Sequence, residues 1–333
     1  MRVLIVKLSS LGDVVHALPA LQDIRRAHPG ASVDWVVEPG FAPLLRRAEG
    51  IGRVIEAPLR RWSQAWAAAA TRAGFGRFRS ELQGERYDAV IDLQGLTKSA
   101  VIARVARLTA SGHRYGLANR TDGAGWERPA RWLVDTPITV PPRIHAMDRS
   151  RELAARALGH QVDGPPRYGL HATALPGKPG RPNVAFVHAS SRDDKGWPTD
   201  HWLAFGRRVL DDGWAIALPQ GSAIERERAE ALRQGWGDAA ADRVEVWPTL
   251  GLDAVLDRLA ATQGVVGVDS GLSHIAVALD LPHVQLYNFP SAWRTGPQAA
   301  HGHAHQCALE GTPTPSVDAA WQAWQRVRSQ VDR

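Results

Sequence analysis

The chain has 333 residues, of which 44% are hydrophobic and 22% are charged, so it can bury a core and is long enough for two domains. No run of ~18 apolar residues occurs, which argues against a membrane-spanning helix, and the first residues meet charge too soon to form a secretion signal. A single cysteine excludes an internal disulfide, and we expect a cytoplasmic protein.

The net charge of +6 is unevenly distributed along the chain. Residues 1–165 hold 24 Lys and Arg against 16 Asp and Glu, whereas residues 166–333 hold 16 against 18. A basic half of this kind attracts nucleic acid, anionic lipid or a phosphorylated substrate. The alternative is a surface that is simply rich in arginine and serves no such partner.

Short apolar, β-branched runs alternate with segments of helical period along the chain. Helices are expected at Trp202–Asp212 and Glu225–Gln234, among others. Continuous apolar strands between helices predict an α/β fold with parallel sheets covered on both faces. The expected strands are Val3–Leu8, Val33–Val37, Arg53–Ile55, Ala89–Leu93, Val184–His188, Trp214–Leu218, Val244–Trp247, Val265–Val268 and His283–Tyr287.

A Pro- and Gly-rich segment at residues 161–182 interrupts this alternation and predicts a linker. We therefore expect one Rossmann-like domain at 1–165, a second at 166–315 and a C-terminal helix at 316–333. Ser316 would cap that helix, which could pack back on the first domain. Two such domains would leave a ligand cleft between the carboxyl ends of their sheets.

Three junctions between a strand and a helix carry small and polar residues. The first runs from Lys7 to Asp13 and contains neither the dinucleotide fingerprint nor a P-loop. Small residues there would let backbone N–H groups approach an anionic ligand. Asp13 is either a capping acid in the first helical turn or, at the carboxyl end of a strand, a general base.

The second junction contains Ser190, Ser191 and Lys195, directly after the first strand of the second domain. Two hydroxyls and an ammonium could hold a diphosphate. The alternative is a solvated turn whose charged side chains pair with one another.

The third junction contains Asp269, Ser270, Gly271 and His274, again where a strand passes into a helix. Backbone N–H groups at such a helix start can receive phosphate oxygens. The same residue types are also common in ordinary helix caps. Three polar junctions in one chain nevertheless favour a ligand-binding protein.

Cys307 stands near His301, His303 and His305, which raises the question of a metal site. The spacing resembles no closed zinc site, so we expect a surface loop there and no bound metal. No carboxylate pair with D-x-D spacing occurs in a suitable loop either, since Asp193 and Asp194 are adjacent.

The segments around these junctions resemble a known family. LIVKLSSLGDVVHALPAL, DAVIDLQGLTKSA, HASSRDDKGWPTDHW and VDSGLSHIAVALDLP are closely similar to the ADP-heptose:lipopolysaccharide heptosyltransferases, glycosyltransferase family 9. The likeness covers roughly residues 1–290, and DWVVEPGF, LRRW and SRDDKGWP are most similar to the type I enzymes.

That resemblance implies a GT-B fold, in which two Rossmann-like domains face each other across a cleft. It implies transfer of heptose, with inversion, from ADP-L-glycero-D-manno-heptose to the inner Kdo of Kdo-lipid A. It further implies no cofactor, no metal and peripheral contact with the anionic cytoplasmic face of the inner membrane, where the basic first domain would gain ~1 kcal/mol per nearby Lys or Arg.

The resemblance also assigns residues to roles. Asp13 corresponds to the family's catalytic base. The donor-binding positions are Ser190, Ser191, Lys195, Glu225, Asp269, Ser270, Gly271 and His274. The acceptor-binding positions are Ser10, Arg60, Arg61, Lys98, Arg120 and Arg149. The sequence departs from the family pattern at residues 288–294, where a Gly-Pro-Thr-type loop is usual, and at residues 121–143.

Three other functions remain open from the sequence. Heptosyltransferase II, or another transferase that uses an ADP-sugar, would keep the fold and change the substrate. A nucleotide-binding protein without transfer activity would tolerate the loss of Asp13. Nucleic-acid binding is suggested by the basic half and thirteen Trp, but no recognition motif accompanies the arginines, and we expect no nucleic-acid partner.

Overall fold

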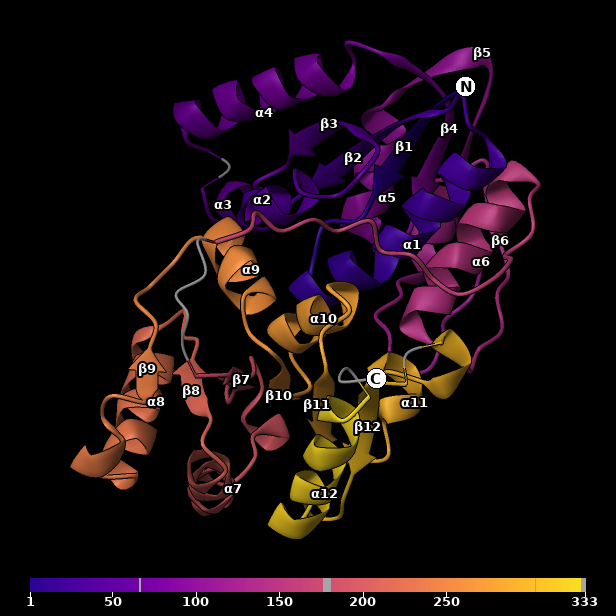
Figure 1. Ribbon diagram of the computed structural model, residues 1–333. Coiled ribbons are helices and arrows are strands. Elements are labelled where there is room, and N and C mark those ends of the chain that lie inside the picture. The colour runs from indigo at the N-terminus through magenta and orange to yellow at the C-terminus, as the bar shows by residue number, and fades with distance from the viewer. Residues whose placement is uncertain (66, 176–180, 303, 331–333) are drawn as a thin grey trace. The chain divides into compact units, whose positions relative to one another are not determined.

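The computed structural model describes residues 1–65, 67–175, 181–302 and 304–330. Contacts between residues divide the chain into two compact units, residues 1–170 and 171–333. Each unit contains a six-stranded sheet in which every pair of neighbouring strands is parallel (Figure 1). The predicted α/β fold with two parallel sheets is therefore confirmed.

The first unit is built on β1, whose apolar residues are buried on both faces of the sheet. Leu4 and Val6 pack with Phe78 of α4 and Ile102 of α5. Val3 and Ile5 point to the opposite face, where α1 and α6 pack against each other. The strands are β1 (Arg2–Val6), β2 (Ser32–Val37), β3 (Ile51–Glu56), β4 (Arg86–Asp92), β5 (Arg107–Leu117) and β6 (Thr136–Ile138), and the helices are α1 (Leu11–Ala27), α2 (Ala42–Leu45), α3 (Leu59–Gln64), α4 (Ala69–Leu82), α5 (Thr97–Val105) and α6 (Ala146–Leu158).

The second unit has a core dominated by aromatic rings. Trp202 packs on Phe186 with ring centroids 5.1 Å apart, and Trp197 meets Trp202 edge to face at 5.0 Å. The strands are β7 (Asn183–Val187), β8 (Ala215–Leu218), β9 (Val244–Val246), β10 (Val265–Val268), β11 (His283–Tyr287) and β12 (Gln306–Glu310), and the helices are α7 (Thr199–Asp211), α8 (Ala223–Gly235), α9 (Leu252–Ala260), α10 (Gly271–Ala278), α11 (Ala292–Thr295) and α12 (Val317–Arg328).

The two sheets share one strand order. The first runs β3-β2-β1-β4-β5-β6 and the second runs β12-β11-β10-β7-β8-β9, which is the same order when each unit is numbered from its own first strand. This is the doubly wound Rossmann order, in which ligands bind at the carboxyl ends of the strands where the order reverses. That point lies between β1 and β4 in the first unit and between β7 and β10 in the second.

The C-terminal helix α12 belongs to the core of the second unit. Trp324 and Val327 are buried there, and the helix contacts α7, β11 and β12. Ser316 accepts a hydrogen bond from the backbone N–H of Ala319 at 3.2 Å, which confirms the predicted N-cap. Residues 331–333 of the predicted C-terminal helix lie outside the described residues.

Two local predictions are wrong. Pro58 before Arg60 and Arg61 and Trp62 after them predict a loop, but both arginines lie inside the short helix α3. Cys307, expected in a surface loop, lies half-buried on β12 and packs against the core, where burial raises the pKa of its thiol. His303 lies outside the described residues.

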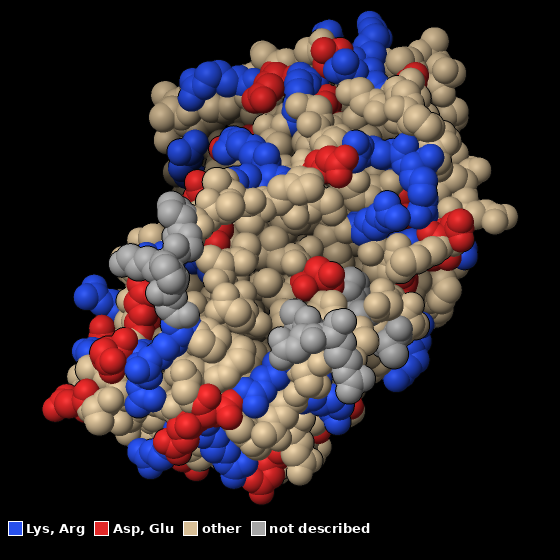
Figure 2. All heavy atoms as spheres, viewed as in Figure 1, with Lys and Arg blue, Asp and Glu red and all other residues tan. Residues whose placement is uncertain are grey.

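The surface of the first unit carries many cations. In Figure 2, Lys and Arg side chains gather over the region where α3 and α4 lie in Figure 1. Several of the thirteen Trp that raised the possibility of nucleic-acid stacking are instead buried in the cores, among them Trp35, Trp62, Trp202 and Trp324. None of the helices in the described part of the chain is both long and apolar enough to cross a membrane.

Candidate active site

The loop after β1 places Asp13 at the point where the first sheet reverses its strand order. Asp13 lies in the first turn of α1, and its Oδ2 accepts hydrogen bonds from the backbone N–H of Ser10 at 3.2 Å and from Ser10 Oγ at 3.0 Å. Asp13 therefore caps the N-terminus of α1, as the capping interpretation of the sequence predicts. The second oxygen, Oδ1, lies 3.7 Å from Lys7 Nζ, and the side chain keeps 34% of its surface exposed. The Asp13 carboxylate is therefore partly accessible to solvent.

Lys7 is the buried partner of Asp13. Its side chain is only 1% exposed, and its ammonium donates to the carbonyl oxygen of Leu93 at 3.3 Å. Burial lowers the pKa of Lys7 to about 8, although Asp13 and Asp92 oppose this shift. Lys7 is therefore still mainly charged at neutral pH.

The pKa of Asp13 reflects several opposing influences. Burial alone would raise it, but the charges of Lys7 and Arg149 and the hydrogen bonds from Ser10 outweigh burial and hold the pKa below its usual range. Asp13 is therefore ionised throughout the neutral range. A general base must begin in this state.

Residues at the end of β4 and just after it hold the loop after β1 in place. Gln94 Oε1 accepts from the backbone N–H groups of Leu8 at 3.1 Å and of Ser9 at 3.3 Å. Asp92 is buried and accepts from the backbone N–H of Gln94 at 2.9 Å and from Ser99 Oγ at 2.9 Å. Burial raises the pKa of Asp92 to about 6 despite these bonds. The loop that carries Asp13 is thus fixed by the neighbouring strand.

The predicted acceptor-binding residues follow the carboxyl ends of strands in the first sheet. Arg60 and Arg61 come after β3, exposed Lys98 is in the first turn of α5 after β4, and exposed Arg120 follows β5. Because parallel strands end at one edge of their sheet, the fold brings these segments to the same edge as Asp13. Arg149 differs from them, since it is 4% exposed and donates to Thr121 Oγ1 at 3.1 Å inside the unit.

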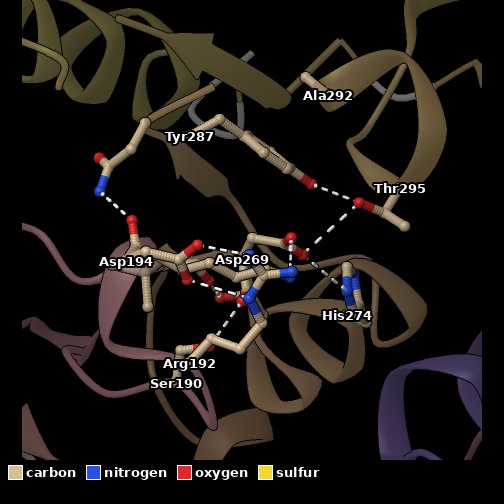
Figure 3. A network of polar contacts seen from close by, with 12 residues as sticks. Ser190, Arg192, Asp194, Asp269, His274, Tyr287, Ala292 and Thr295 are labelled. Atoms are coloured by element: carbon tan, nitrogen blue, oxygen red, sulfur yellow. Dashed lines mark hydrogen bonds and ion pairs between the residues drawn. The ribbon is translucent and has the colours of Figure 1, made fainter. Parts of the chain in front are cut away.

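Asp269 is the centre of the corresponding network in the second unit (Figure 3). Lys195 Nζ lies 2.6 Å from Asp269 Oδ2, and His274 Nε2 lies 3.3 Å from Asp269 Oδ1. Burial would raise the pKa of Asp269, but His274 and Lys195 hold it well below its usual range. The carboxylate is therefore ionised and orients two donor side chains.

Sequence reasoning missed a second group of residues behind Asp269. Thr295 Oγ1 donates to Asp269 Oδ1 at 3.5 Å, and the hydroxyl of buried Tyr287 lies 3.2 Å from Thr295 Oγ1 (Figure 3). Tyr287 was recognised only as the end of a strand, and nothing in the sequence links it to Asp269. The signal that could have found it is a polar aromatic residue at the end of a strand next to β10.

Ser190 and Ser270 lie on the two sides of the reversal point in the second sheet. Ser190 Oγ donates to the carbonyl oxygen of Asp269 at 3.1 Å, which joins the loop after β7 to the end of β10. The Oγ atom of Ser270 is buried and has no hydrogen-bond partner among the described residues. It stands at the N-cap of α10, where the helix dipole favours an anion. Ser191 is exposed in the loop after β7.

A glycine lets α10 approach the sheet closely at this point. A Cβ atom on Gly267 in β10 would lie 2.5 Å from Ser273 Oγ and 2.7 Å from Val187 Cβ. Without that side chain, Ser273 reaches the carbonyl oxygen of Val268 at 2.6 Å. The N-terminus of α10 is therefore held against the carboxyl end of β10.

Glu225 lies at the start of α8, after β8. Its carboxylate accepts from the backbone N–H of Gly221 at 2.6 Å, and its own backbone N–H donates to Ser222 Oγ at 3.2 Å. This capping arrangement fixes the direction of the side chain at the same sheet edge as Lys195 and Asp269. It accounts for the local position of Glu225 without requiring a ligand.

Two Rossmann-like units of identical strand order are the architecture of the GT-B glycosyltransferases. Residues 75–319 match the family model for glycosyltransferase family 9 (heptosyltransferase), and the chain belongs to this family. It is 43% identical over 291 residues to lipopolysaccharide heptosyltransferase 1 of Escherichia coli K12, covering 86% of this chain and 88% of that protein.

Two solved structures of the E. coli heptosyltransferase WaaC have the same fold over 100% of this chain and 99% of theirs, each at 37% identity. The structure with ADP has a TM-score of 0.82, and the structure with ADP-2-deoxy-2-fluoro heptose has a TM-score of 0.79. The family predicted from the sequence is thereby confirmed.

Proposed function

We propose that the protein is an inverting heptosyltransferase that moves heptose from ADP-L-glycero-D-manno-heptose to the inner Kdo of Kdo-lipid A, a step of lipopolysaccharide core synthesis. The observation that carries the proposal is the network of Lys195, Asp269 and His274 beside the unpartnered Ser270 hydroxyl at the start of α10. Its cations and helix dipole suit a diphosphate. Similarity to proteins that are named heptosyltransferases and that bind ADP or an ADP-heptose analogue supports heptose as the sugar.

Asp13 would act on the acceptor in the first unit. As the acceptor hydroxyl attacks the anomeric carbon, the Asp13 carboxylate takes the hydroxyl proton, a contribution of ~10²–10⁴-fold in rate. The leaving ADP gains negative charge as the glycosidic C–O bond breaks. Lys195 and the N-terminus of α10 would stabilise that charge.

These cationic groups lead us to propose that transfer needs no metal ion. The sequence offers no D-x-D carboxylate pair, and Asp269 is already engaged with two donor side chains. Activity should therefore change by less than about twofold in excess EDTA, because one ammonium and one helix end supply the charge stabilisation. Loss of activity in EDTA that magnesium restores would contradict this proposal.

The basic face of the first unit would hold the enzyme at the cytoplasmic side of the inner membrane. Each exposed Lys or Arg near an anionic lipid surface contributes ~1 kcal/mol. We expect co-sedimentation with phosphatidylglycerol vesicles at low salt and none with phosphatidylcholine vesicles. Equal binding to both vesicles would remove the membrane from the proposal.

Product analysis tests the proposed reaction directly. Purified enzyme is incubated with ADP-heptose and Kdo-lipid A, and mass spectrometry follows the addition of one heptose. Heptosyl-Kdo-lipid A serves as the comparison acceptor, because a type II enzyme would extend it instead. In cells, loss of the gene should leave a core that is truncated directly after Kdo, and an intact core would overturn the proposal.

A further inference from the structure

Asn288 contacts the backbone on both sides of Lys195. Its side-chain amide donates one hydrogen bond to the carbonyl oxygen of Asp194 at 2.9 Å and another to that of Gly196 at 2.9 Å. An amide NH₂ group has two hydrogens, so both are used on the residues that flank Lys195. Asn288 lies at the start of the segment 288–294, where the sequence departs from the family pattern.

Asn288 is itself held from the other side. Its Oδ1 accepts a hydrogen bond from Thr314 Oγ1 at 2.8 Å. The opposite orientation of the amide would turn its oxygen toward two carbonyl oxygens and its nitrogen toward the hydroxyl, which fits the donors and acceptors poorly. Asn288 also follows directly on Tyr287, the buried last residue of β11. The amide is therefore anchored to the sheet.

The segment that carries Lys195 has little structure of its own to fix it. Lys195 ends a single 3-10 turn, Asp193–Lys195, which is held by backbone bonds from Lys195 to Arg192 at 3.2 Å and from Gly196 to Asp193 at 2.9 Å. Residues 191–194 are exposed. Short 3-10 turns have poor hydrogen-bond geometry, so contacts from outside decide where Lys195 lies.

Trp197, two residues after Lys195, is also tied to the segment after β12. Trp197 is fully buried, and its indole N–H donates to the carbonyl oxygen of Pro315 at 2.8 Å. Trp197 and Asn288 therefore tie residues 194–197 to residues 314–315 along two routes. The route through Asn288 is the one that reaches both sides of Lys195.

We propose that Asn288 is a positioning residue for Lys195. By holding the carbonyl groups of Asp194 and Gly196, it directs the Lys195 ammonium to Asp269 and to the N-terminus of α10, where the diphosphate would bind. This inference rests on the donor-binding role proposed for Lys195. It assigns a function to the segment in which this chain differs from the family pattern.

A double-mutant cycle tests the proposal. ADP affinity by calorimetry, together with kcat and KM for ADP-heptose, is measured for Asn288→Ala, Lys195→Ala and the double variant. In the presence of Lys195, we expect Asn288→Ala to weaken ADP binding and to lower kcat, each by about tenfold, as for residues coupled in one network. In the Lys195→Ala background, the same substitution should change either quantity by less than about twofold.

Two further variants separate positioning from general stability. Thr314→Val keeps the Asn288 amide but removes the hydrogen bond that Thr314 Oγ1 donates to it. It should therefore weaken ADP binding and lower kcat as Asn288→Ala does, but by a smaller factor. Gln263→Ala is the matched control, since the Gln263 amide also bridges backbone groups, accepting from Asn183 at 2.8 Å and donating to Ala261 at 3.3 Å. That bridge lies at the amino end of β7, and its loss should lower Tm while leaving ADP affinity and kcat unchanged.

The outcomes distinguish this inference from the proposed function. If Lys195→Ala keeps full ADP affinity and rate, the donor role of Lys195 fails and the inference fails with it. If Lys195→Ala is impaired but Asn288→Ala binds ADP normally, or is equally harmful in both backgrounds, only the positioning role of Asn288 is overturned.

Discussion

The two units use the same pair of residue types in opposite ways. At the reversal point of the first sheet, the lysine is buried, with Lys7 1% exposed, and the carboxylate of Asp13 is 34% exposed. At the reversal point of the second sheet, Asp269 is 7% exposed and Lys195 is 21% exposed. In each unit the buried member orients the exposed one. The first unit therefore exposes a carboxylate at its reversal point, and the second exposes an ammonium group.

This difference follows from where each residue stands in the chain. Lys7 directly follows the last residue of buried strand β1, so its side chain lies under the loop, whereas Asp13 comes later, in the first turn of α1. In the second unit the carboxylate of Asp269 directly follows buried strand β10, and Lys195 stands in an exposed turn. The residue next to the strand becomes the buried partner in both cases.

The largest expected effect comes from removing the exposed carboxylate. Asp13→Asn should lower kcat by ~10²–10⁴-fold, because an amide cannot take the hydroxyl proton. Its carbonyl oxygen can still accept from the Ser10 backbone, so α1 should begin as before. ADP affinity, measured by calorimetry, should stay within about twofold, since the base belongs to the other substrate. Near-normal turnover would remove Asp13 from the mechanism and end the comparison between the two units.

Removing the exposed cation should have a different signature. We expect Lys195→Ala to weaken ADP binding by about tenfold and to lower kcat by about 10²-fold, because developing charge on the leaving group is stabilised more than charge in the ground state. Arg233→Ala is the control, since Arg233 forms a surface pair with Glu230 at 2.8 Å on α8. Steady-state kinetics measure kcat, and calorimetry measures ADP affinity, for both variants. Weaker ADP binding with an unchanged kcat would mean that Lys195 only anchors the donor.

Substitution of the buried Lys7 should change the dependence of kcat on pH. The charge of Lys7 is the strongest influence that lowers the pKa of Asp13, and burial raises that pKa. Lys7→Met removes this charge, so the pKa of Asp13 should rise and Asp13 should become protonated at higher pH. The acidic limb of kcat against pH should move upward by about one pH unit or more, which corresponds to ~1.4 kcal/mol per unit. Activity at pH 8 should suffer less than activity at pH 5. An unchanged acidic limb would show that Lys7 does not tune Asp13.

The same variant has an expected effect on stability. The pKa of Lys7 is lowered from 10.5 to about 8 in the folded state, so its charged form disfavours folding. This penalty is complete below pH 8 and disappears as pH rises through the unfolded pKa of 10.5. Lys7→Met should therefore gain stability relative to the unchanged protein at pH 7 and lose that gain near pH 10.5. Denaturant unfolding at the two pH values measures the difference.

The sequence was sufficient to predict much of the fold and the positions of the polar junctions. Parallel strands buried on both faces are almost continuously apolar, and β1 and β10 show this pattern plainly. β5 was missed because Arg107–Leu117 contains Gly, His and Arg and is buried only toward its end. β12 was missed because the histidines before Cys307 suggested a loop.

The arrangement of the site could be predicted only in part. Asp13, Lys195 and Asp269 were identifiable because the carboxyl ends of parallel strands meet at one edge. The burial of Lys7 and Arg149 was not, because burial depends on what packs over a side chain from distant segments. The contact of Asn288 with the segment around Lys195 joins residues 92 to 94 positions apart. No local pattern in the sequence encodes a contact of that kind.

The smallest expected effect concerns Arg60 and Arg61. Because both lie in the helix α3, their substitutions should have different effects on the acceptor KM. In a helix these neighbours point about 100° apart, and the buried residue Trp62 fixes which side of α3 faces the core. Only one of the two arginines can then face a common anionic acceptor. One single variant to alanine should raise the acceptor KM by about two- to fivefold, the range of an exposed ion pair, while the other has no effect.

The double variant should match the more harmful single variant, and its effect should shrink as salt rises, because screening acts over ~10 Å at 0.1 M ionic strength. Arg86→Ala makes the same change of charge at the amino end of β4, away from the carboxyl edge, and should leave the acceptor KM unchanged. Kinetics at two salt concentrations measure all four variants.

Equal and additive effects of Arg60→Ala and Arg61→Ala would show that both arginines reach the acceptor, and the helical geometry would then not separate their roles. No change in acceptor KM at low salt would leave both as solvated surface residues, and the contrast between the two units would rest on the aspartate and lysine pairs alone.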